Sequence, residues 1–317
     1  MKAVWLENQK LSVRDDLSIP QPPQGEALVR ILLAGICGTD LAMAEGYYPY
    51  VGVPGHEFVG EVVTTADESL IGKRVVGEIN AVCGRCESCR AGRPTHCSTR
   101  TVLGMKGRNG AFAEYLTLPQ ANLREVPDSV SNEDAVFAEP LAAALQIQQQ
   151  VWIRPEDRVL LIGAGRLGQL IAQSLVPTGC GLTVVARYPR QRRLLWEKGI
   201  SVIPNEVVPA AYYDVVIDAT GSPSGFGLAI RAVRPRGTLV LKSTYRGEVS
   251  ADLSSLVVNE ITVIGSRCGS VDQALRLLEW GSVEPTELIE AEYPLAEALE
   301  AYDRAEQPGA LKVLVRP

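Results

Sequence analysis

The sequence predicts an α/β protein in which a partly open β-barrel precedes a doubly wound parallel sheet, and two observations support this. Residues 1–120 contain short apolar strands separated by Gly and Pro, as is typical of a small barrel. Beyond Asp134, apolar strands alternate with amphipathic helices, and this rhythm predicts a parallel sheet covered on both faces. Because 317 residues exceed what one compact core usually holds, we expect two domains with a cleft between them.

Five strands are expected in the first part, because β-branched and apolar residues alternate there between turns. They are Ala3–Trp5, Ala27–Ala34, Phe58–Thr64, Arg74–Glu78 and Ala113–Leu118. The next segment, Asp134–Gln150, is rich in Ala, Leu and Gln, and we expect it to form one helix.

The second part continues as alternating strands and helices. Strands are expected at Arg158–Ile162, Thr183–Ala186, Val215–Asp218 and Thr238–Lys242, with helices that begin at Arg166, Pro189 and Ser224. Val257–Ile264 follows as a long apolar edge strand, which would aggregate if it were left bare. Two helices and a strand come last, at Val271–Trp280, Leu295–Ala305 and Lys312–Val315.

Composition and charge narrow the class of protein. Apolar residues make up 46% of the chain and charged residues 21%, which is ordinary for a globular enzyme. The net charge of −6 argues against a nucleic-acid or anionic-membrane partner. No stretch approaches the ~18 apolar residues of a membrane span, and residues 1–13 lack the apolar centre of a secretory signal. Seven cysteines, an odd number with metal-type spacing, predict reduced thiols and a cytoplasmic location.

The strongest motif is a run of four cysteines with the spacing C-x2-C-x2-C-x7-C. Its members are Cys83, Cys86, Cys89 and Cys97. Four thiolates on a short loop that contains Gly84 and Gly92 suit a tetrahedral zinc ion. Because four protein ligands leave no position for water or substrate, we expect residues 83–97 to form a structural zinc lobe.

A glycine-rich turn predicts a dinucleotide site. The segment from Gly163 to Gly168 reads G-A-G-R-L-G, follows the strand Arg158–Ile162 and opens a helix. Gly163 would make the tight turn, Gly165 would let the backbone approach a pyrophosphate, and Gly168 would pack the helix on the strand. Arg166 and Leu167 begin that helix, whose free N–H groups favour phosphate. A turn without a ligand is the alternative.

The end of the next strand favours NADP(H) over NAD(H). An NAD site usually has an acidic residue there to bind the ribose 2′-hydroxyl, but this chain has Ala186 and Arg187. Further arginines follow at positions 190, 192 and 193. Guanidinium groups bind a phosphate through paired hydrogen bonds, so we expect Arg187 and Arg192 to contact a 2′-phosphate, with Arg187 the main contact. A solvated basic turn of helix is the alternative.

A second metal centre is expected from residues outside the lobe. Cys37 precedes Gly-Thr-Asp, His56 is one of only two histidines, and a Glu lies in each of the segments Gly55-His56-Glu57 and Ala138-Glu139-Pro140. A catalytic zinc has three protein ligands and one open position. Cys37, His56 and a carboxylate provide such a set, and Asp40 could hold the second nitrogen of His56. Taken singly, each residue could instead be structural.

These motifs resemble the zinc-containing medium-chain dehydrogenase/reductase superfamily, closest to its sorbitol and threonine dehydrogenases. The resemblance rests on I-C-G-T-D, G-H-E, the four-cysteine lobe, E-P-L-A and G-A-G-x-L-G, and it covers essentially the whole chain. It implies a GroES-like catalytic domain at residues 1–139, a Rossmann domain at 140–267, and a return to the catalytic domain at 268–317.

The resemblance also assigns roles to single residues. Cys37 and His56 become catalytic zinc ligands, and either Glu57 or Glu139 becomes the third. Thr39 matches the hydroxyl residue of a proton relay, but Ala42 stands where a relay histidine is expected. Thr220 and Arg267 match cofactor-contacting positions, although Arg267 could also be an ordinary surface residue at a strand end.

The function implied is a zinc-dependent, NADP(H)-linked oxidoreductase that interconverts an alcohol or polyol and its aldehyde or ketone. We expect two zinc ions per chain and a small-molecule substrate. In the family the edge strand pairs with its copy, so a homodimer is expected, or a tetramer. Two alternatives share the fold: a zinc-free NADPH reductase of the quinone type, and a non-catalytic NADPH-binding sensor.

Overall fold

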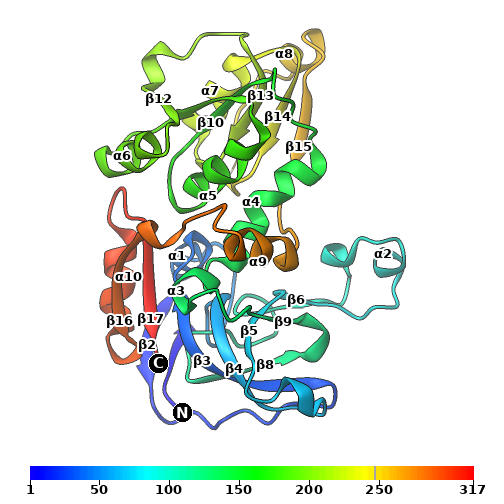
Figure 1. The fold of residues 1–317 in the computed structure, drawn as a ribbon, viewed down its shortest axis with the longest axis vertical. Coiled ribbons are helices and arrows are strands. Elements are labelled where there is room, and N and C mark those ends of the chain that lie inside the picture. The colour runs from blue at the N-terminus through cyan, green and yellow to red at the C-terminus, as the bar shows by residue number, and fades with distance from the viewer. Residues whose placement is uncertain (246–247) are drawn as a thin grey trace. The chain divides into compact units, whose positions relative to one another are not determined.

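A computed structural model describes residues 1–245 and 248–317, and the chain divides into two compact units (Figure 1). The first unit comprises Met1–Glu139, Ser270–Gly281 and Leu288–Pro317. The second comprises Pro140–Gly269 and Ser282–Glu287. The first unit is therefore assembled from both ends of the chain, whereas the second is nearly continuous.

The first unit is built on a seven-stranded sheet of mostly antiparallel strands. Its order is β16-β17-β3-β4-β5-β9, and β8 also pairs with β3. The strands are β3 (Glu26–Gly35), β4 (Glu57–Thr64), β5 (Arg74–Gly77), β8 (Tyr115–Pro119), β9 (Leu123–Glu125), β16 (Ile289–Pro294) and β17 (Lys312–Arg316). Two small sheets accompany it, β1 (Ala3–Glu7) with β2 (Lys10–Arg14) and β6 (Asn80–Ala81) with β7 (Thr101–Val102). The helices of this unit are α1 (Gly38–Ala44), α2 (Glu87–Arg90), α3 (Asn132–Ala135), α9 (Val271–Glu279) and α10 (Ala298–Glu306).

The register of three strands brings distant residues together. In the antiparallel pair of β3 and β4, Gly35 lies opposite Glu57. On the other side of β3, Gly35 lies opposite Leu314 of β17. The segment after β3, the start of β4 and the start of β17 therefore meet at one point.

Alternating burial along these strands explains why they form a sheet. In β3 the inward side chains of Leu33 and Val29 are fully buried, whereas Arg30 is exposed. Val59 of β4 and Leu116 of β8 are buried beside them. Each such apolar side chain stabilises the fold by about 1.5–3 kcal/mol relative to an exposed one.

The second unit is a six-stranded parallel sheet in the order β12-β11-β10-β13-β14-β15. The strands are β10 (Arg158–Ile162), β11 (Gly181–Val185), β12 (Ser201–Ile203), β13 (Tyr213–Asp218), β14 (Val233–Leu241) and β15 (Thr262–Gly265). The helices are α4 (Ala138–Gln150), which begins in the first unit, α5 (Arg166–Leu175), α6 (Pro189–Glu197), α7 (Pro223–Ala232) and α8 (Leu253–Val258). The predicted fold class, a β-rich domain followed by a doubly wound parallel sheet, is confirmed.

The strand order of this sheet reverses between β10 and β13. Chain connections run outward through α5 and α6 on one side of this point and through α7 and α8 on the other, so the two pairs of helices cover opposite faces (Figure 1). In open sheets of this kind, ligands bind outside the carboxyl ends of the strands at the reversal.

Two of the expected elements are wrong. Val257–Ile264 is not one strand, because Asp252 caps a helix by accepting a hydrogen bond from Ser254 N, and that helix, α8, includes Val257 and Val258. Glu260 then has a φ of +51°, which interrupts the chain before β15. The helix expected over Asp134–Gln150 is divided into α3 and α4, and α3 begins earlier because Ser131 caps it.

None of the helices formed by residues 1–245 and 248–317 has the length and apolar character needed to cross a membrane.

Candidate metal and cofactor sites

Cys37 occupies a fixed position at the start of α1. It is the N-cap residue of this helix, and its backbone N–H donates to Asp40 Oδ2 at 2.9 Å. Such a reciprocal cap satisfies a helix-end donor that would otherwise lack a partner. The thiol of Cys37 is thereby held at the point where β3 ends.

His56 comes from the turn that leads into β4. Gly55 has a φ of +98°, and a Cβ there would lie 2.9 Å from the ring of Phe112, so only glycine fits before this histidine. His56 is 3% exposed, and its Nδ1 lies 3.3 Å from Asp40 Oδ1. Asp40 thus accepts a hydrogen bond from the backbone of Cys37 and lies beside Nδ1 of His56, which leaves Nε2 for a metal.

Glu57 is buried beside a lysine. Glu57 and Lys312 are each 1% exposed and form an ion pair through Oε2 and Nζ. Lys312 Nζ also lies 5.5 Å from the centroid of the Phe137 ring. A Cβ at Gly35 would lie 2.6 Å from Glu57 Oε2, so the missing side chain makes room for this carboxylate.

Cys37, His56 and Glu57 form a group that could hold a metal ion. Their ligand atoms all lie within 4.8 Å of one another. A thiolate, an imidazole and a carboxylate are the donors of a catalytic zinc site with an open fourth position. Glu139, in the first turn of α4, is not a member of this group. Thr39 stands beside it, with Oγ1 3.8 Å from Cys37 Sγ.

The electrostatics of the group favour a cation. Burial lowers the pKa of His56, but the negative charges of Asp40 and Cys37 outweigh burial and raise it well above its ordinary value. A metal ion would supply at this point the positive charge that a proton otherwise brings. The side chains present therefore fit zinc.

The four cysteines of the lobe also fit zinc. They converge within 4.8 Å, and the Sγ–Sγ distances are 3.5 Å for Cys86–Cys89 and 3.6 Å for Cys83–Cys97. A zinc tetrahedron with Zn–S bonds of about 2.3 Å has edges of about 3.8 Å, whereas a disulfide would need about 2.0 Å. The lobe projects from the sheet of the first unit as a loop around α2 (Figure 1).

One thiol of the lobe is already suited to ionise. The backbone N–H of Cys83 and the hydroxyl of Thr99 interact with Cys97 Sγ at 3.5 Å and 3.6 Å. These contacts lower the pKa of Cys97 to about 6. Because the thiolate is the form that binds metal, this favours metal binding at neutral pH.

The glycine turn of the second unit has the shape of a phosphate cradle. Gly163 has a φ of +100°, and a Cβ at Gly168 would lie 2.1 Å from Gly163 O, so both positions require glycine. In contrast, a Cβ at Gly165 would meet nothing within 4 Å. Gly165 is the N-cap of α5, and Arg166 and Leu167 form its first turn. The open space thus lies in front of free helix N–H groups, as a pyrophosphate needs.

The arginines after β11 differ in their surroundings. Arg192 Nε donates to Ala186 O at 2.8 Å, which fixes the guanidinium at the carboxyl end of β11. Arg187 is exposed and makes no hydrogen bond or ion pair with the described part of the chain. Arg193 pairs with Glu197 at 3.7 Å.

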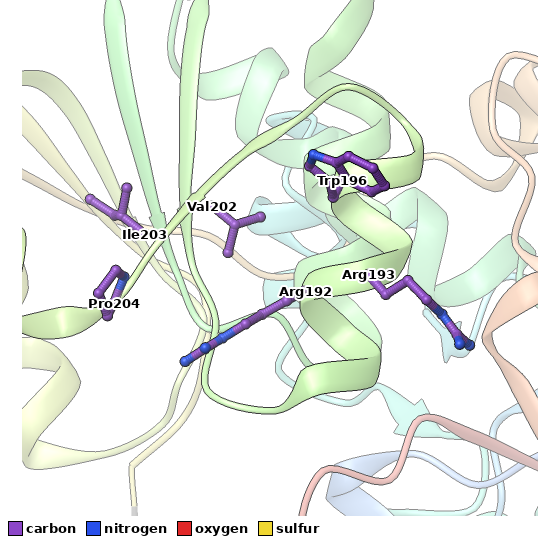
Figure 2. A pocket seen from close by; sticks show the side chains of 6 residues that line it. All are labelled: Arg192, Arg193, Trp196, Val202, Ile203 and Pro204. Atoms are coloured by element: carbon purple, nitrogen blue, oxygen red, sulfur yellow. The ribbon is translucent and has the colours of Figure 1, made fainter.

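A cavity of about 340 Å³ lies between α6 and β12. Its lining consists of Arg192, Arg193, Trp196, Val202, Ile203 and Pro204. Figure 2 shows that Arg192 extends toward Pro204, whereas Arg193 points to the opposite side of the helix. The guanidinium of Arg192 is therefore held in place by Ala186 O and also lines an open cavity.

Thr220 and Arg267 lie at the carboxyl ends of other strands of the same sheet. Thr220 Oγ1 donates to Asp218 Oδ1 at 2.7 Å, and its methyl group lies 3.1 Å from where a Gly163 Cβ would be. Arg267 follows β15, and its carbonyl accepts from Lys242 Nζ. Sequence reasoning missed this contact of Lys242, which is 8% exposed, although a lysine at the end of the apolar run 239–241 was a visible signal.

Comparison with known families matches both units. A family model of the alcohol dehydrogenase GroES-like domain matches residues 23–128, and one of the zinc-binding dehydrogenases matches residues 167–281. The D-arabitol-phosphate dehydrogenase of Enterococcus avium is 27% identical over 325 residues, which cover 95% of this chain and 92% of that protein.

Two solved structures share the fold over the whole chain. One is a zinc-binding dehydrogenase from Sinorhizobium meliloti 1021, solved with NADP bound. It is 29% identical, with a TM-score of 0.92, and the match covers 100% of this chain and 99% of that one. The other is an alcohol dehydrogenase from Escherichia coli CFT073 complexed with NADH, with 28% identity, the same TM-score and the same coverage. The chain belongs to the zinc-containing medium-chain dehydrogenase/reductase superfamily, in the branch of the polyol, alcohol and threonine dehydrogenases.

Proposed function

We propose that the protein is a zinc-dependent, NADP(H)-linked oxidoreductase that interconverts an alcohol or polyol and its aldehyde or ketone. The observation that carries this proposal is the convergence of Cys37, His56 and Glu57 within 4.8 Å, because two anionic donors and an imidazole with a fixed ring suit zinc that retains an open position. The phosphate cradle at Gly165 adds the cofactor that such a reaction needs.

The residues around the metal-ligand group each have a task in this reaction. When bound, zinc supplies a Lewis acid that makes the alcohol proton easier to remove. Thr39 Oγ1, close to Cys37 Sγ, accepts the hydrogen bond of the substrate hydroxyl and passes the proton on. Asp40 keeps the ring of His56 oriented, and Lys312 holds Glu57 at the edge of the ligand group. NADP⁺, when bound, would accept the hydride from the alcohol carbon. Ala42 offers no side chain for a relay, so the proton would leave through water, the cofactor ribose or Glu57.

Glu57 is our choice for the third ligand over Glu139. Glu57 is a member of the ligand group, and Glu139 is not. The pairing of Glu57 with Lys312 leaves its second oxygen, Oε1, as the atom for the metal. Replacement of Glu57 by Gln is then expected to lower the zinc content of the catalytic site, whereas Glu139→Gln is expected to retain it, as measured by metal analysis.

The preference for NADP(H) rests on the end of β11. No carboxylate follows this strand where an NAD site needs one, and Arg192 presents a guanidinium fixed by Ala186 O. We therefore assign the 2′-phosphate to Arg187 and Arg192 together, with Arg192 as the preorganised partner.

A second copy of the chain is the partner we propose. β15 is the edge strand of the parallel sheet, and Val263 on it is 42% exposed. On the neighbouring helix α8, Leu253, Val257 and Val258 are 66% to 79% exposed. A bare apolar edge invites strand pairing, so a homodimer through β15 is expected, or a tetramer built from it. The reduced thiols of the lobe support a cytoplasmic location.

The test of the proposed function is a screen of NADPH-linked reduction and NADP⁺-linked oxidation over aldehydes, ketones, alcohols and polyols, with NAD(H) as the control. The proposal expects turnover that stops when the catalytic zinc is removed and a kcat/KM at least tenfold higher with NADP(H). Turnover by the metal-free protein would favour a quinone-type reductase, and cofactor binding without turnover would favour a sensor.

A further inference from the structure

A lysine is buried at the carboxyl end of the parallel sheet. Lys242 directly follows β14 and is 8% exposed, after a strand that places Leu239 and Val240 fully in the core. A lysine is rarely buried this deeply unless polar atoms surround its ammonium group, because burial of a bare charge is costly. The contacts of this ammonium group therefore show what the residue does at the edge of the sheet.

The ammonium group of Lys242 is held by oxygen atoms at the end of the neighbouring strand. Its Nζ donates to Ser266 Oγ at 3.2 Å and to the backbone carbonyl of Arg267, and both residues follow β15. The backbone of Lys242 continues the ladder, since its N–H donates to Asp218 O at 2.9 Å. A hydroxyl and a carbonyl oxygen solvate the positive charge, but neither carries a formal charge that would cancel it.

This part of the edge is where the nicotinamide half of a dinucleotide is expected. The sheet order reverses between β10 and β13, and a dinucleotide binds across such a reversal with one mononucleotide on each side. The cradle at Gly163 follows β10, and Arg192, on the adenosine side, lies at the end of β11. The nicotinamide nucleotide then lies over the ends of β13, β14 and β15. Lys242 ends the middle one of these three strands.

The charge of the nicotinamide ring changes in the reaction. The oxidised ring is a pyridinium with one positive charge. When its C4 takes a hydride, with both electrons, from the alcohol carbon, the ring becomes a neutral dihydropyridine. A fixed positive charge nearby therefore disfavours the oxidised ring and has little effect on the reduced one. Because salt screens buried charges less than exposed ones, Lys242 has more influence than the exposed Arg267.

We propose that Lys242 tunes the bound cofactor: its ammonium group weakens the binding of the oxidised dinucleotide relative to the reduced one. The inference rests on the proposed function only in requiring a nicotinamide dinucleotide at this edge, and it depends neither on the substrate nor on the 2′-phosphate. On the protein, the same charge favours the transfer of hydride to the cofactor, which is the direction of alcohol oxidation.

A buried acid at the same edge provides a test of opposite sign. Asp218 ends β13 and is 0% exposed. Its carboxylate accepts hydrogen bonds from Thr220 Oγ1 at 2.7 Å and from the hydroxyl of Tyr245. A negative charge at this point favours the pyridinium, so its removal should act against the removal of Lys242.

The size of the effect follows from the spacing of the strands. β14 is the second strand from β10, and neighbouring strands lie about 4.8 Å apart, so Lys242 is about 10 Å from the reversal point. Two unit charges about 10 Å apart, at an effective dielectric constant of about 20–40, change a ratio of dissociation constants about four- to fifteenfold.

The test measures the dissociation constants of the oxidised and the reduced cofactor by calorimetry in the zinc-loaded protein, with NADP(H) and with NAD(H). Lys242→Met and Lys242→Gln both remove the charge, and Gln keeps a hydrogen-bond donor. Each should lower the ratio of the oxidised to the reduced dissociation constant about four- to fifteenfold. Lys242→Arg keeps the charge and should retain the wild-type ratio, whereas Asp218→Asn should raise it.

Lys198→Met is the matched control. The side chain of Lys198 is 18% exposed, and the residue follows α6, which returns from the carboxyl end of β11 to the amino end of β12. Lys198 therefore lies at the opposite edge of the sheet, and its replacement should leave the ratio unchanged. A wild-type ratio in both Lys242→Met and Lys242→Gln, an equal change in Lys198→Met, or no binding of either dinucleotide would overturn the inference. The expected ratios without turnover of any alcohol or carbonyl compound would refute the proposed function and support the inference.

Discussion

The buried ion pair of Glu57 and Lys312 makes a quantitative prediction. Both side chains are 1% exposed, so replacement of Lys312 by Met would leave the Glu57 carboxylate without its partner in an apolar environment. Removal of one member of a buried pair costs about 3–5 kcal/mol, because the remaining charge is neither solvated nor compensated. We therefore expect Lys312→Met to lower the free energy of unfolding by about this amount.

The assay is urea unfolding of the metal-free protein, in which no zinc ion compensates the charge of Glu57, followed by fluorescence, with a matched control. Lys73 and Glu125 also form an ion pair, at 2.7 Å, but they are 48% and 52% exposed. Lys73→Met should therefore cost at most about 1 kcal/mol. The double variant Lys312→Met with Glu57→Gln should recover much of the lost stability, because the unpaired charge is gone. A Lys312→Met variant as stable as Lys73→Met, or a double variant with the summed losses, would refute the reasoning.

Three further predictions concern other parts of the chain. Replacement of Cys83 by Ser should remove about one zinc ion per chain, measured by metal analysis, and should lower the midpoint of thermal unfolding. An unchanged zinc content would contradict the structural role of the lobe. Burial raises the pKa of Asp214, but the hydrogen bonds from Arg158 and Arg234 outweigh burial and hold this pKa below its ordinary value of 3.8. The ionised Asp214 therefore stabilises the fold above pH 3.8, and this stabilisation is lost as the pH falls below 3.8. Asp214→Asn should therefore be less stable than the wild type at pH 7, and the difference should shrink below about pH 4; a difference that grows on acidification would reverse the sign of this argument. Val263→Lys should convert a dimer into a monomer in light scattering at an unchanged thermal midpoint, and a persistent dimer would exclude the β15 edge as the interface.

Much of the fold follows from local patterns in the sequence. The strand before Gly163 is a continuous apolar run from Val159 to Ile162, as a buried parallel strand requires, and the residues that begin α5 and α6 were placed correctly. The pattern failed at Val257–Ile264, because apolar residues of α8 that face solvent look the same as residues of an edge strand. The capping side chain of Asp252 was the local signal of a helix.

The pairing of strands that lie far apart in the sequence could not be predicted in this way, although the strand Lys312–Val315 itself was expected. β16 alternates apolar and acidic residues (Ile-Glu-Ala-Glu-Tyr), but none of its side chains is fully buried, and it pairs in parallel with β17. β17 in turn is fixed by β3, more than two hundred residues earlier in the sequence. The ion pair of Lys312 with Glu57 depends on this pairing, so a sequence without a fold cannot reveal it.

The candidate site was predicted by residue type but not by geometry. The spacing of the four cysteines alone indicated a metal lobe, because ligands so close in sequence must be close in space. Cys37 and His56 are far apart in sequence, and only the register of β3 and β4 brings them together. The choice between Glu57 and Glu139 also needed the fold, since both follow a plausible motif and only Glu57 joins the group.

The most direct test of the account is the zinc content and the NADPH-linked activity of Cys37→Ala beside the wild type, with Cys180→Ala as a control for a thiol outside both metal groups. We expect about two zinc ions per chain in the wild type and the control, and about one in Cys37→Ala, which should have lost its alcohol and carbonyl turnover. A Cys37→Ala protein that keeps two zinc ions and full activity would contradict the account.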